Sequence, residues 1–214
     1  MNSSQLKTKL KSQKLEIADA HAIRIHRAIS WLKCAESAKD NDDLAFISLW
    51  ISFNACYAVQ TPKDDLLSEK ENFLIFLQKL VKHDTEKRFY NLLWNQFSGP
   101  VRLLINNQFV FKPFWDFQRG EIKDWKKPFD QSVNDSMKYL SAQKVVELLE
   151  VVLDRLYTLR NQLVHGGATF KSEVNRAQVT DGRNMLALLT PLIIEIMLEN
   201  NKEEWGDIYY PVIG

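Results

Sequence analysis

One stretch of the chain, Ala142 to Gly167, limits most strongly what the protein can fold into. Its apolar residues follow one another at alternating steps of four and three, which is the spacing of one face of an α-helix. These residues are Val145, Leu149, Val152, Leu156, Leu159 and Leu163. The pattern ends at Gly166-Gly167, because glycine readily takes the left-handed conformation that ends helices. We therefore predict a long core helix that carries Arg160, Asn161 and His165 in its last turns.

Further helices are predicted before this stretch. Apolar residues again step by three and four from about Leu15 to Ala38. The next helix, LAFISLWISFNACYAV, is apolar nearly all round, so it belongs at the centre of a bundle with other helices against most of its surface. Asn41 to Asp43 lie between the two and favour a helical hairpin. The fold class that follows is an all-α helical bundle.

The rest of the chain predicts shorter helices and one more long one. A capping box at Ser68 to Glu71 marks the start of a third helix, and a fourth is expected from about Thr85 to Gln96. Pro100 favours the start of a short helix. A last helix is expected from about Arg176 to Glu199, kinked or divided at Pro191. The aromatic tail that follows should pack onto the body or onto a second subunit.

Length and composition favour a single domain. A chain of 214 residues is long enough for one substantial core, and 7 Gly and 6 Pro leave little room for long flexible linkers. We expect one helical domain over 1-214, with an aromatic and basic insertion at about 108-140. The formal net charge of +1 predicts no general attraction to nucleic acid, so any RNA contact would depend on a local patch.

The predicted insertion is partly irregular, because helical periodicity fails there while rings and cations gather. The rings are Phe109, Phe111, Phe114, Trp115, Phe117, Trp125 and Phe129, and the cations are Lys112, Arg119, Lys123, Lys126 and Lys127. Such a mixture can form a platform on which unpaired bases stack. It can also fold back and bury its rings over the bundle, as large aromatic residues usually do. We prefer the second interpretation.

Signals for targeting, for a membrane span and for cofactors are missing from the sequence. No apolar segment follows the basic N-terminus, and the apolar run from Leu44 to Val59 is shorter than the about 20 residues that span a bilayer. We expect a cytoplasmic protein without a membrane partner, with Cys34 and Cys56 as buried free thiols. No cofactor or metal is expected, since the phosphate-binding, dinucleotide-binding and zinc-protease motifs are absent and the four histidines lack ligand spacing.

The last turns of the predicted core helix read Arg160-Asn161-Gln162-Leu163-Val164-His165. This order resembles the R-N-x-x-x-H motif of the HEPN superfamily. The stretches LWISFNACY and HGGATFKSEVNRAQVTDGRNMLALL also look like bacterial HEPN proteins, whereas Thr61 to Ser141 matches no motif. The resemblance implies a HEPN-type helical bundle and a homodimer that places two copies of Arg160 and His165 in one cleft. It also implies a metal-independent endoribonuclease that acts on RNA, in phage defence or as a toxin with a nucleotidyltransferase-like antitoxin.

The spacing of the motif does not bring its residues together on one helix. At roughly 100° per residue, Arg160 and His165 point about 140° apart, whereas Asn161 and His165 share a side. Two arrangements would form a compact site. Either the last turn unwinds at the glycines and lets His165 swing back, or a second copy of the helix supplies the missing groups across a two-fold axis. HEPN proteins use the second arrangement, so the resemblance implies a symmetric dimer.

The residue types suit cleavage of RNA by its own 2′-hydroxyl. That reaction needs a proton removed from the hydroxyl, a proton given to the leaving oxygen, and support for negative charge on phosphorus. Histidine titrates near neutral pH, so His165 is the candidate acid or base. Arginine stays charged and matches phosphate oxygens with its planar fork, so Arg160 is the candidate phosphate ligand. Asn161 is expected to orient His165 or to hold the phosphate.

The same residues allow plainer interpretations. Arginine and histidine near the end of a helix interact favourably with its negative terminus, and surface positions there are often basic for that reason alone. The alternative to a nuclease is a non-catalytic HEPN module that binds RNA, a nucleotide or a protein through the same cleft. A third hypothesis is a purely structural dimerisation domain.

Asn54 is the unusual residue of the apolar second helix. A buried amide without hydrogen-bond partners costs about 1–3 kcal/mol. We prefer the interpretation that Asn54 is a structural amide that fixes the register of the helices. The sharper hypothesis is that Asn54, with Trp50 and Tyr57 one turn to either side, supports the site at the end of the motif helix.

Overall fold

The computed structural model describes residues 1–13, 16–59, 69–171, 173 and 176–212. Within these ranges the chain is all-α, with ten α-helices, one π-helical segment, one 3-10 turn and no strand. The predicted all-α bundle is confirmed. The helices divide into two compact units, of which unit 1 holds Met1–Glu86 and Leu186–Gly214 and unit 2 holds Lys87–Met185. The single domain over 1-214 stays a prediction, and each unit is described by itself.

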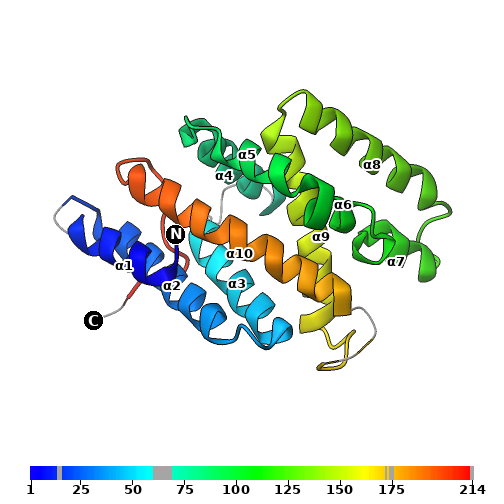
Figure 1. Ribbon diagram of the computed structural model, residues 1–214, viewed down its shortest axis with the longest axis horizontal. Helices are drawn as coiled ribbons and strands as arrows, with labels where there is room; N and C mark the ends of the chain where they lie inside the picture. Colours follow the sequence, from blue (N-terminus) through cyan, green and yellow to red (C-terminus); the bar gives the residue numbers. More distant parts are fainter. Residues whose placement is uncertain (14–15, 60–68, 172, 174–175, 213–214) are drawn as a thin grey trace. The chain divides into compact units, whose positions relative to one another are not determined.

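Unit 1 is formed by the first four helices, the second half of the last helix and the C-terminal tail (Figure 1). Its helices are α1 (Ser3–Ser12), α2 (Asp19–Ser37), α3 (Asp42–Tyr57), α4 (Glu69–His83) and the part of α10 (Arg176–Glu199) from Leu186 onward. α2 begins at Asp19 and not at Leu15 as predicted, because a separate helix, α1, precedes it. α1 was missed because it buries little besides Leu6, although Asn2 and Gln5 form a capping box at its start.

The pairing of α2 with α3 follows the predicted hairpin. The Asn41 side chain caps α3 by accepting a hydrogen bond from the backbone N–H of Leu44 at 3.2 Å. Ser52 on α3 donates to the carbonyl of Ala28 on α2 at 2.6 Å, which joins the two helices in the interior. Nine residues of α3 are buried: Asp43, Ala45, Phe46, Ser48, Leu49, Trp50, Ser52, Phe53 and Cys56. The expectation that this helix is covered on most sides is therefore confirmed.

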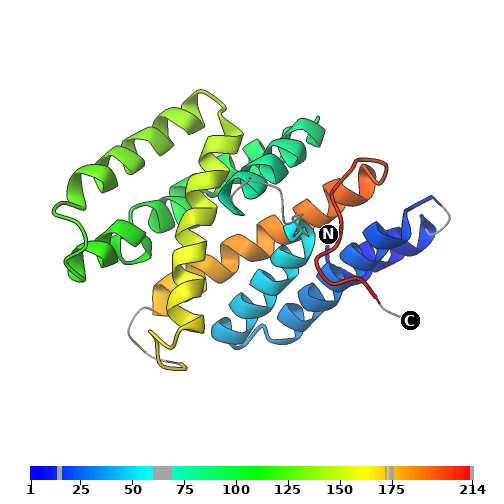
Figure 2. The ribbon, with the colours of Figure 1, turned by 180° about the vertical axis from the view of Figure 1, so that it is seen from behind.

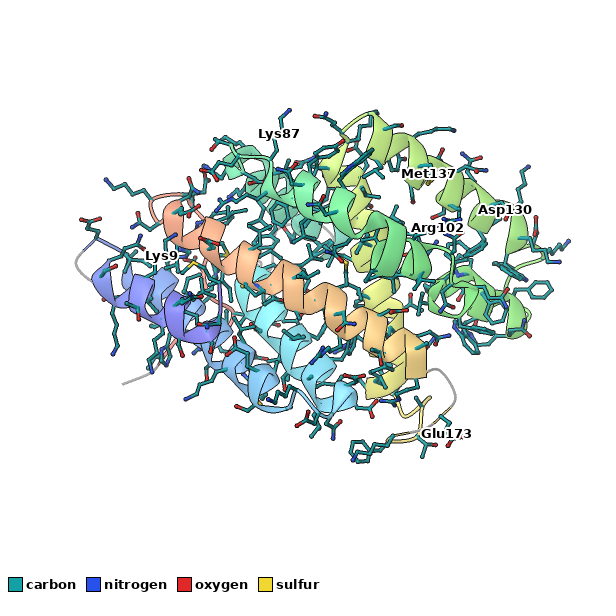
Figure 3. The ribbon with its side chains drawn as sticks, in the orientation of Figure 1. Lys9, Lys87, Arg102, Asp130, Met137 and Glu173 are labelled. Atoms are coloured by element: carbon teal, nitrogen blue, oxygen red, sulfur yellow. The ribbon has the colours of Figure 1, made fainter. Side chains whose placement is uncertain are left out.

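The C-terminal tail packs onto unit 1, as its aromatic content predicted. Trp205 and Ile208 are buried, and Ile208 forms an isolated antiparallel bridge with Val59 after α3. The tail returns along α2 (Figure 2). In the last turn of α1, Lys9 (labelled in Figure 3) forms an ion pair with Glu199 of α10, with 2.7 Å between Lys9 Nζ and Glu199 Oε1.

Unit 2 contains the remaining helices. They are α5 (Arg88–Gln96), the π-helical segment Phe97–Val101, α6 (Arg102–Ile105), the 3-10 turn Gln108–Val110, α7 (Lys112–Gln118), α8 (Lys126–Ser141), α9 (Val145–Val164) and the start of α10. α8 and α9 form a hairpin (Figures 1 and 2). Gln143 takes a positive φ of 55° in the short connection between them.

Three further expectations differ from the structure. α8 is a regular helix inside the predicted irregular insertion, where residue 111 and residues 119–125 are non-helical. Its period was hidden because Ser136 and Leu140 are its only fully buried residues. The expected short helix begins at Arg102 after a π-helical segment, and α10 is not divided at Pro191. The capping box at Ser68 lies outside the described residues.

Both cysteines are free thiols, but only one is buried. Cys56 on α3 is fully buried, as predicted, whereas Cys34 on α2 is exposed. Cys34 lies two residues after the buried Leu32, which places it on the opposite side of the helix. In the parts of the chain that the structure describes, no helix has both the length and the apolar character needed to cross a bilayer.

Candidate functional site

The buried face of α9 matches the predicted apolar stripe. Leu149, Val152, Leu156 and Leu159 are each at most 1% exposed. The two outer members of the stripe, Val145 and Leu163, are half-buried. The stripe fixes the rotation of the helix, and the motif residues in its last turns lie at or near the surface as a consequence.

The end of α9 is closed by two glycines. Gly166 takes a left-handed φ of 72° and donates its backbone N–H to the carbonyl of Leu163 at 3.3 Å. Gly167 donates to the carbonyl of Gln162 at 2.7 Å. These two bonds form a Schellman motif, which satisfies carbonyls that a helix end otherwise leaves open. A Cβ at Gly167 would lie 3.0 Å from the backbone oxygen of Gln162, which is a tight contact, so both positions favour glycine.

Arg160 is held by its neighbour in the motif. Its Nη1 donates to Asn161 Oδ1 at 2.9 Å, and its Nε is buried without a hydrogen-bond partner. The structure shows no ion pair between Arg160 and a carboxylate of the described chain, so the amide positions the guanidinium without cancelling its charge. A half-buried cation in this state is suited to an anionic ligand such as a phosphate.

His165 is the C-cap residue that follows α9, and it is exposed. Its backbone N–H still donates to the carbonyl of Asn161 at 3.0 Å, which continues the helical hydrogen bonds up to this residue, whereas its own φ of −88° and ψ of 12° leave the helical conformation. The side chains of Arg160 and His165 therefore diverge by about 140°, as on an ideal helix. The last turn does not unwind before the glycines. Within one chain, the structure brings Arg160 and Asn161 together and leaves His165 apart from Arg160.

The aromatic segment is tied to the same end of α9. The carbonyl of Phe109 accepts hydrogen bonds from Gln162 Nε2 at 2.5 Å and from Trp115 Nε1 at 2.8 Å. The rings pack mostly edge to face on one another, with centroid distances of 5.0 Å for Phe114 and Trp125 and 5.3 Å for Phe111 and Phe129.

Two of the five cations of this segment form ion pairs with described carboxylates. Lys112 and Arg119 both form ion pairs with Asp116, and Arg119 also pairs with Glu121. Of the seven rings, Phe111 alone is buried, whereas Phe109 and Phe117 are exposed. The interpretation that the segment buries its rings over the bundle therefore stays a prediction.

The three predicted support residues lie in the other unit. Trp50, Asn54 and Tyr57 are on α3 in unit 1, whereas the motif belongs to unit 2. Trp50 and Tyr57 pack on Phe53 with ring centroids 5.5 and 5.1 Å away, and Asn54 Oδ1 is buried without a hydrogen-bond partner. Their support of the motif stays a prediction.

Arg155 is a residue of α9 that sequence reasoning missed. It is 1% exposed, its guanidinium carbon lies 4.3 Å from the centre of the Phe111 ring, and its Nη2 donates to Ser132 Oγ of α8 at 3.0 Å. Burial lowers the pKa of Arg155 to about 10. The only signal in the sequence was its place three residues after Val152 on the apolar face.

Comparisons of this chain with protein-family models, with curated proteins and with solved structures find no match. Among the residues that the structure describes, no group of three or more His, Cys, Asp and Glu side chains is placed to hold a metal ion. The site is thus defined by its own geometry: an unneutralised arginine and an exposed histidine at the closed end of a core helix.

Proposed function

We propose that the protein is a metal-independent endoribonuclease of the HEPN type, with a composite site at a homodimer interface. The observation that supports it most is the state of Arg160, which Asn161 holds in place and no described carboxylate neutralises, five residues before an exposed histidine. The remaining support is the resemblance of the motif to the HEPN superfamily.

The chemistry assigns one role to each residue. The 2′-oxygen of the RNA attacks the adjacent phosphorus while a neutral His165 takes its proton. The bond from phosphorus to the 5′-oxygen breaks, and that oxygen takes a proton from water, whose hydroxide is neutralised by the proton on His165, so that each site needs one Arg160 and one His165. Arg160 donates hydrogen bonds to the non-bridging oxygens, whose negative charge grows in the transition state. The products are a 2′,3′-cyclic phosphate and a free 5′-hydroxyl.

A second copy of the chain is part of the proposal because one helix does not assemble the site. The exposed Tyr157 and Val164 are seven residues apart and lie on the same side of α9 as Asn161. An exposed apolar pair beside the motif suits a two-fold contact in which the same patch meets itself. Such a contact brings Arg160 of one copy towards His165 of the other.

The biological role rests on the resemblance alone. Bacterial HEPN nucleases act in phage defence or as toxins, and a toxin of this type is restrained by a nucleotidyltransferase-like antitoxin. The exposed motif at the end of α9 is the surface that such an antitoxin would cover.

The test is cleavage of a mixed RNA pool in EDTA by the purified dimer. His165→Ala and Arg160→Ala should each reduce the rate by at least about 100-fold. His26→Ala and Arg102→Ala are the matched controls, since both residues are exposed and lie outside the motif. Products with 2′,3′-cyclic phosphate ends are expected. A correctly folded dimer that cleaves no RNA would contradict the proposal.

One observation favours the non-catalytic binding module as a second candidate. The side chain of His165 makes no hydrogen bond with any described residue, whereas a catalytic histidine is usually oriented by a partner. RNA or nucleotide binding that depends on Arg160, without cleavage, would select this module. A dimer with neither binding nor cleavage would leave the structural dimerisation domain.

A further inference from the structure

Unit 1 contains a groove that lies outside the motif. Its volume is about 820 Å³, and it opens between α2, α3, the first turn of α4 and the C-terminal tail. The tail forms one side of the groove through Ile208, Tyr209 and Tyr210. It runs along α2 (Figure 2), where Arg24 donates hydrogen bonds to the carbonyls of Trp205 and Gly206. Small-molecule sites commonly measure about 300–1,000 Å³, so this groove has room for a metabolite or a single nucleotide and not for a folded RNA.

The charge of the groove is positive. Arg24 and Arg27 of α2 line it, and none of the described residues that line it is an Asp or Glu. The two arginines are three residues apart, which places them on the same face of the helix. Two like charges on one face repel each other, and an anion between them would remove that repulsion.

Arg24 is a buried cation with neutral partners. It is 2% exposed, and it donates to the backbone carbonyls of Trp205 at 2.8 Å and of Gly206 at 2.8 Å. Its Nε is buried without a hydrogen-bond partner, and no ion pair joins it to Asp207 or to another described carboxylate. Arg24 therefore fixes the tail and adds positive charge to the groove, with the carboxylate of Asp207 near it but not in ion-pair contact.

Arg27 is the arginine that a ligand can reach. It is half-buried, and it makes no hydrogen bond or ion pair with any residue that the structure describes. A guanidinium with all its donors unused beside a groove is suited to bind a phosphate through two parallel hydrogen bonds.

The groove also offers flat aromatic faces and an unused amide. Trp31 is 40% exposed, Tyr209 52% and Tyr210 72%, although all three line the groove. Exposed rings beside arginines are the usual surface on which a base stacks. Asn54, also in the lining, has a buried Oδ1 without a partner, and an N–H on the edge of a base would satisfy it.

We propose that this groove binds a nucleoside phosphate. Arg27 binds the phosphate within the positive field that Arg24 provides, the base stacks on Trp31 and the tail tyrosines, and Asn54 bonds to the edge of the base. The shared chemistry is a 5′-phosphorylated nucleoside, supplied either as a free nucleotide or as the end of an RNA. The proposal is independent of cleavage at Arg160 and His165, which lie in unit 2.

The experiment is calorimetric titration of the full chain with AMP. The wild type should bind, and Arg27→Ala and Trp31→Ala should each weaken binding by about tenfold or more. Arg102→Ala is the matched control, because Arg102 (labelled in Figure 3) is an exposed arginine of α6 in unit 2 and is not among the residues that line the groove. The affinity of Arg102→Ala for AMP should stay within about twofold of the wild-type affinity. Both test variants should keep the wild-type melting temperature, since Arg27 has no partner to lose and Trp31 is exposed.

Further titrations separate the parts of the ligand. Adenosine and inorganic phosphate should each bind more weakly than AMP. Adenosine binding as tightly as AMP would overturn the role of Arg27, and inorganic phosphate doing so would overturn the role of the rings. A 5′-phosphorylated oligonucleotide that binds more tightly than AMP would assign the groove to RNA ends, and the reverse order would assign it to free nucleotides.

Two results would overturn the proposal as a whole: no AMP binding by the wild type, or equal binding by Arg27→Ala and Arg102→Ala. Its failure is distinguishable from failure of the nuclease. His165→Ala should abolish cleavage and keep AMP binding, whereas Arg27→Ala should do the opposite.

Discussion

Arg24, Arg155 and Arg160 show three ways in which this protein holds a guanidinium mainly through neutral groups, although Arg155 also lies 3.9 Å from the exposed carboxylate of Asp154. Arg24 donates to two backbone carbonyls, Arg155 lies over the ring of Phe111 and donates to a serine, and Arg160 donates to a neighbouring amide. The surroundings decide what each does. Arg155 is enclosed, so it has a structural role, whereas Arg24 borders a groove and Arg160 is only half-buried.

Arg155 provides the clearest test of such a structural role. Arg155→Ala should lower the free energy of unfolding by roughly 3 kcal/mol, because it leaves a cavity over Phe111 and removes the partner of Ser132. Arg155→Met keeps most of the packing and loses the buried charge, so it should cost less than half as much. Urea denaturation of both variants measures the difference. Equal losses of unfolding free energy in the two variants would show that the charge of Arg155, and not its packing, stabilises the fold.

His21 should make the stability of the protein sensitive to mild acid. Its Nε2 donates to the carbonyl of Met197 at 3.1 Å, and its Nδ1 is buried without a partner. Burial lowers the pKa of His21, and the nearby Arg24 lowers it further. Because the pKa of His21 is lower in the folded state than in the unfolded state, the unfolded chain takes up a proton first as the pH falls. The contribution of His21 to the free energy of unfolding is therefore fully present above the unfolded pKa of about 6.5, and it is lost as the pH drops below that value.

The corresponding measurement is urea denaturation at about pH 7 and about pH 5. His21→Gln should lose less stability between these values than the wild type, since glutamine cannot take up a proton. His26→Gln, at an exposed position, is the control and should behave as the wild type does. A loss on acidification that is the same in all three proteins would contradict the assignment.

The two cysteines should differ strongly in reactivity. Burial raises the pKa of Cys56 to about 12, so almost none of it is thiolate at neutral pH, whereas Cys34 is exposed. A disulfide reagent should modify one thiol per native chain rapidly. Cys34→Ser should abolish this fast phase and Cys56→Ser should retain it. A fast phase that survives Cys34→Ser would contradict the burial of Cys56.

At the scale of the element, the closed end of α9 depends on Gly166. Alanine at Gly166 must adopt a φ of 72°, which strains an L-residue although the space for its Cβ is open. Gly166→Ala should therefore cost about 1 kcal/mol of unfolding free energy. Gly166→Asn should cost less, because asparagine tolerates this conformation. Thermal and urea denaturation compare the two, and an alanine variant as stable as the wild type would contradict the strain.

The elements that sequence alone predicted are those with a clear apolar period. α3, α9 and α10 were found almost to the residue, because burial of one face or of the whole surface leaves a regular pattern. α1 and α8 were missed because each buries only two residues fully. The burial of Arg24 had no signal in the sequence, since the carbonyls that hold it come from a tail about 180 residues away.

The candidate site was predicted in part for the same physical reason. Helical spacing placed Arg160, Asn161 and His165 at the end of α9, and it also indicated that Arg160 and His165 point apart. The contact between Arg160 and Asn161 depends on side-chain conformation, which the period of a helix does not specify.

At the scale of the whole molecule, the proposed nuclease requires two chains. If the functional pair is Arg160 of one chain and His165 of the other, a mixed dimer of one Arg160→Ala chain and one His165→Ala chain keeps one such pair. Co-expression of the Arg160→Ala and His165→Ala chains with different tags, followed by sequential purification, yields this dimer. It should cleave RNA at about half the wild-type rate, because one of two equivalent pairs is intact.

The matched control carries the same two substitutions on one chain. A dimer of the wild type with the double variant Arg160→Ala, His165→Ala has one intact pair within a single chain and none between chains. It should be inactive, because the helical geometry of α9 holds the two side chains about 140° apart within one chain. The opposite result, an active control and an inactive mixed dimer, would show that one chain assembles the site alone. Either outcome also reports whether the dimer forms, since both species are isolated through two tags.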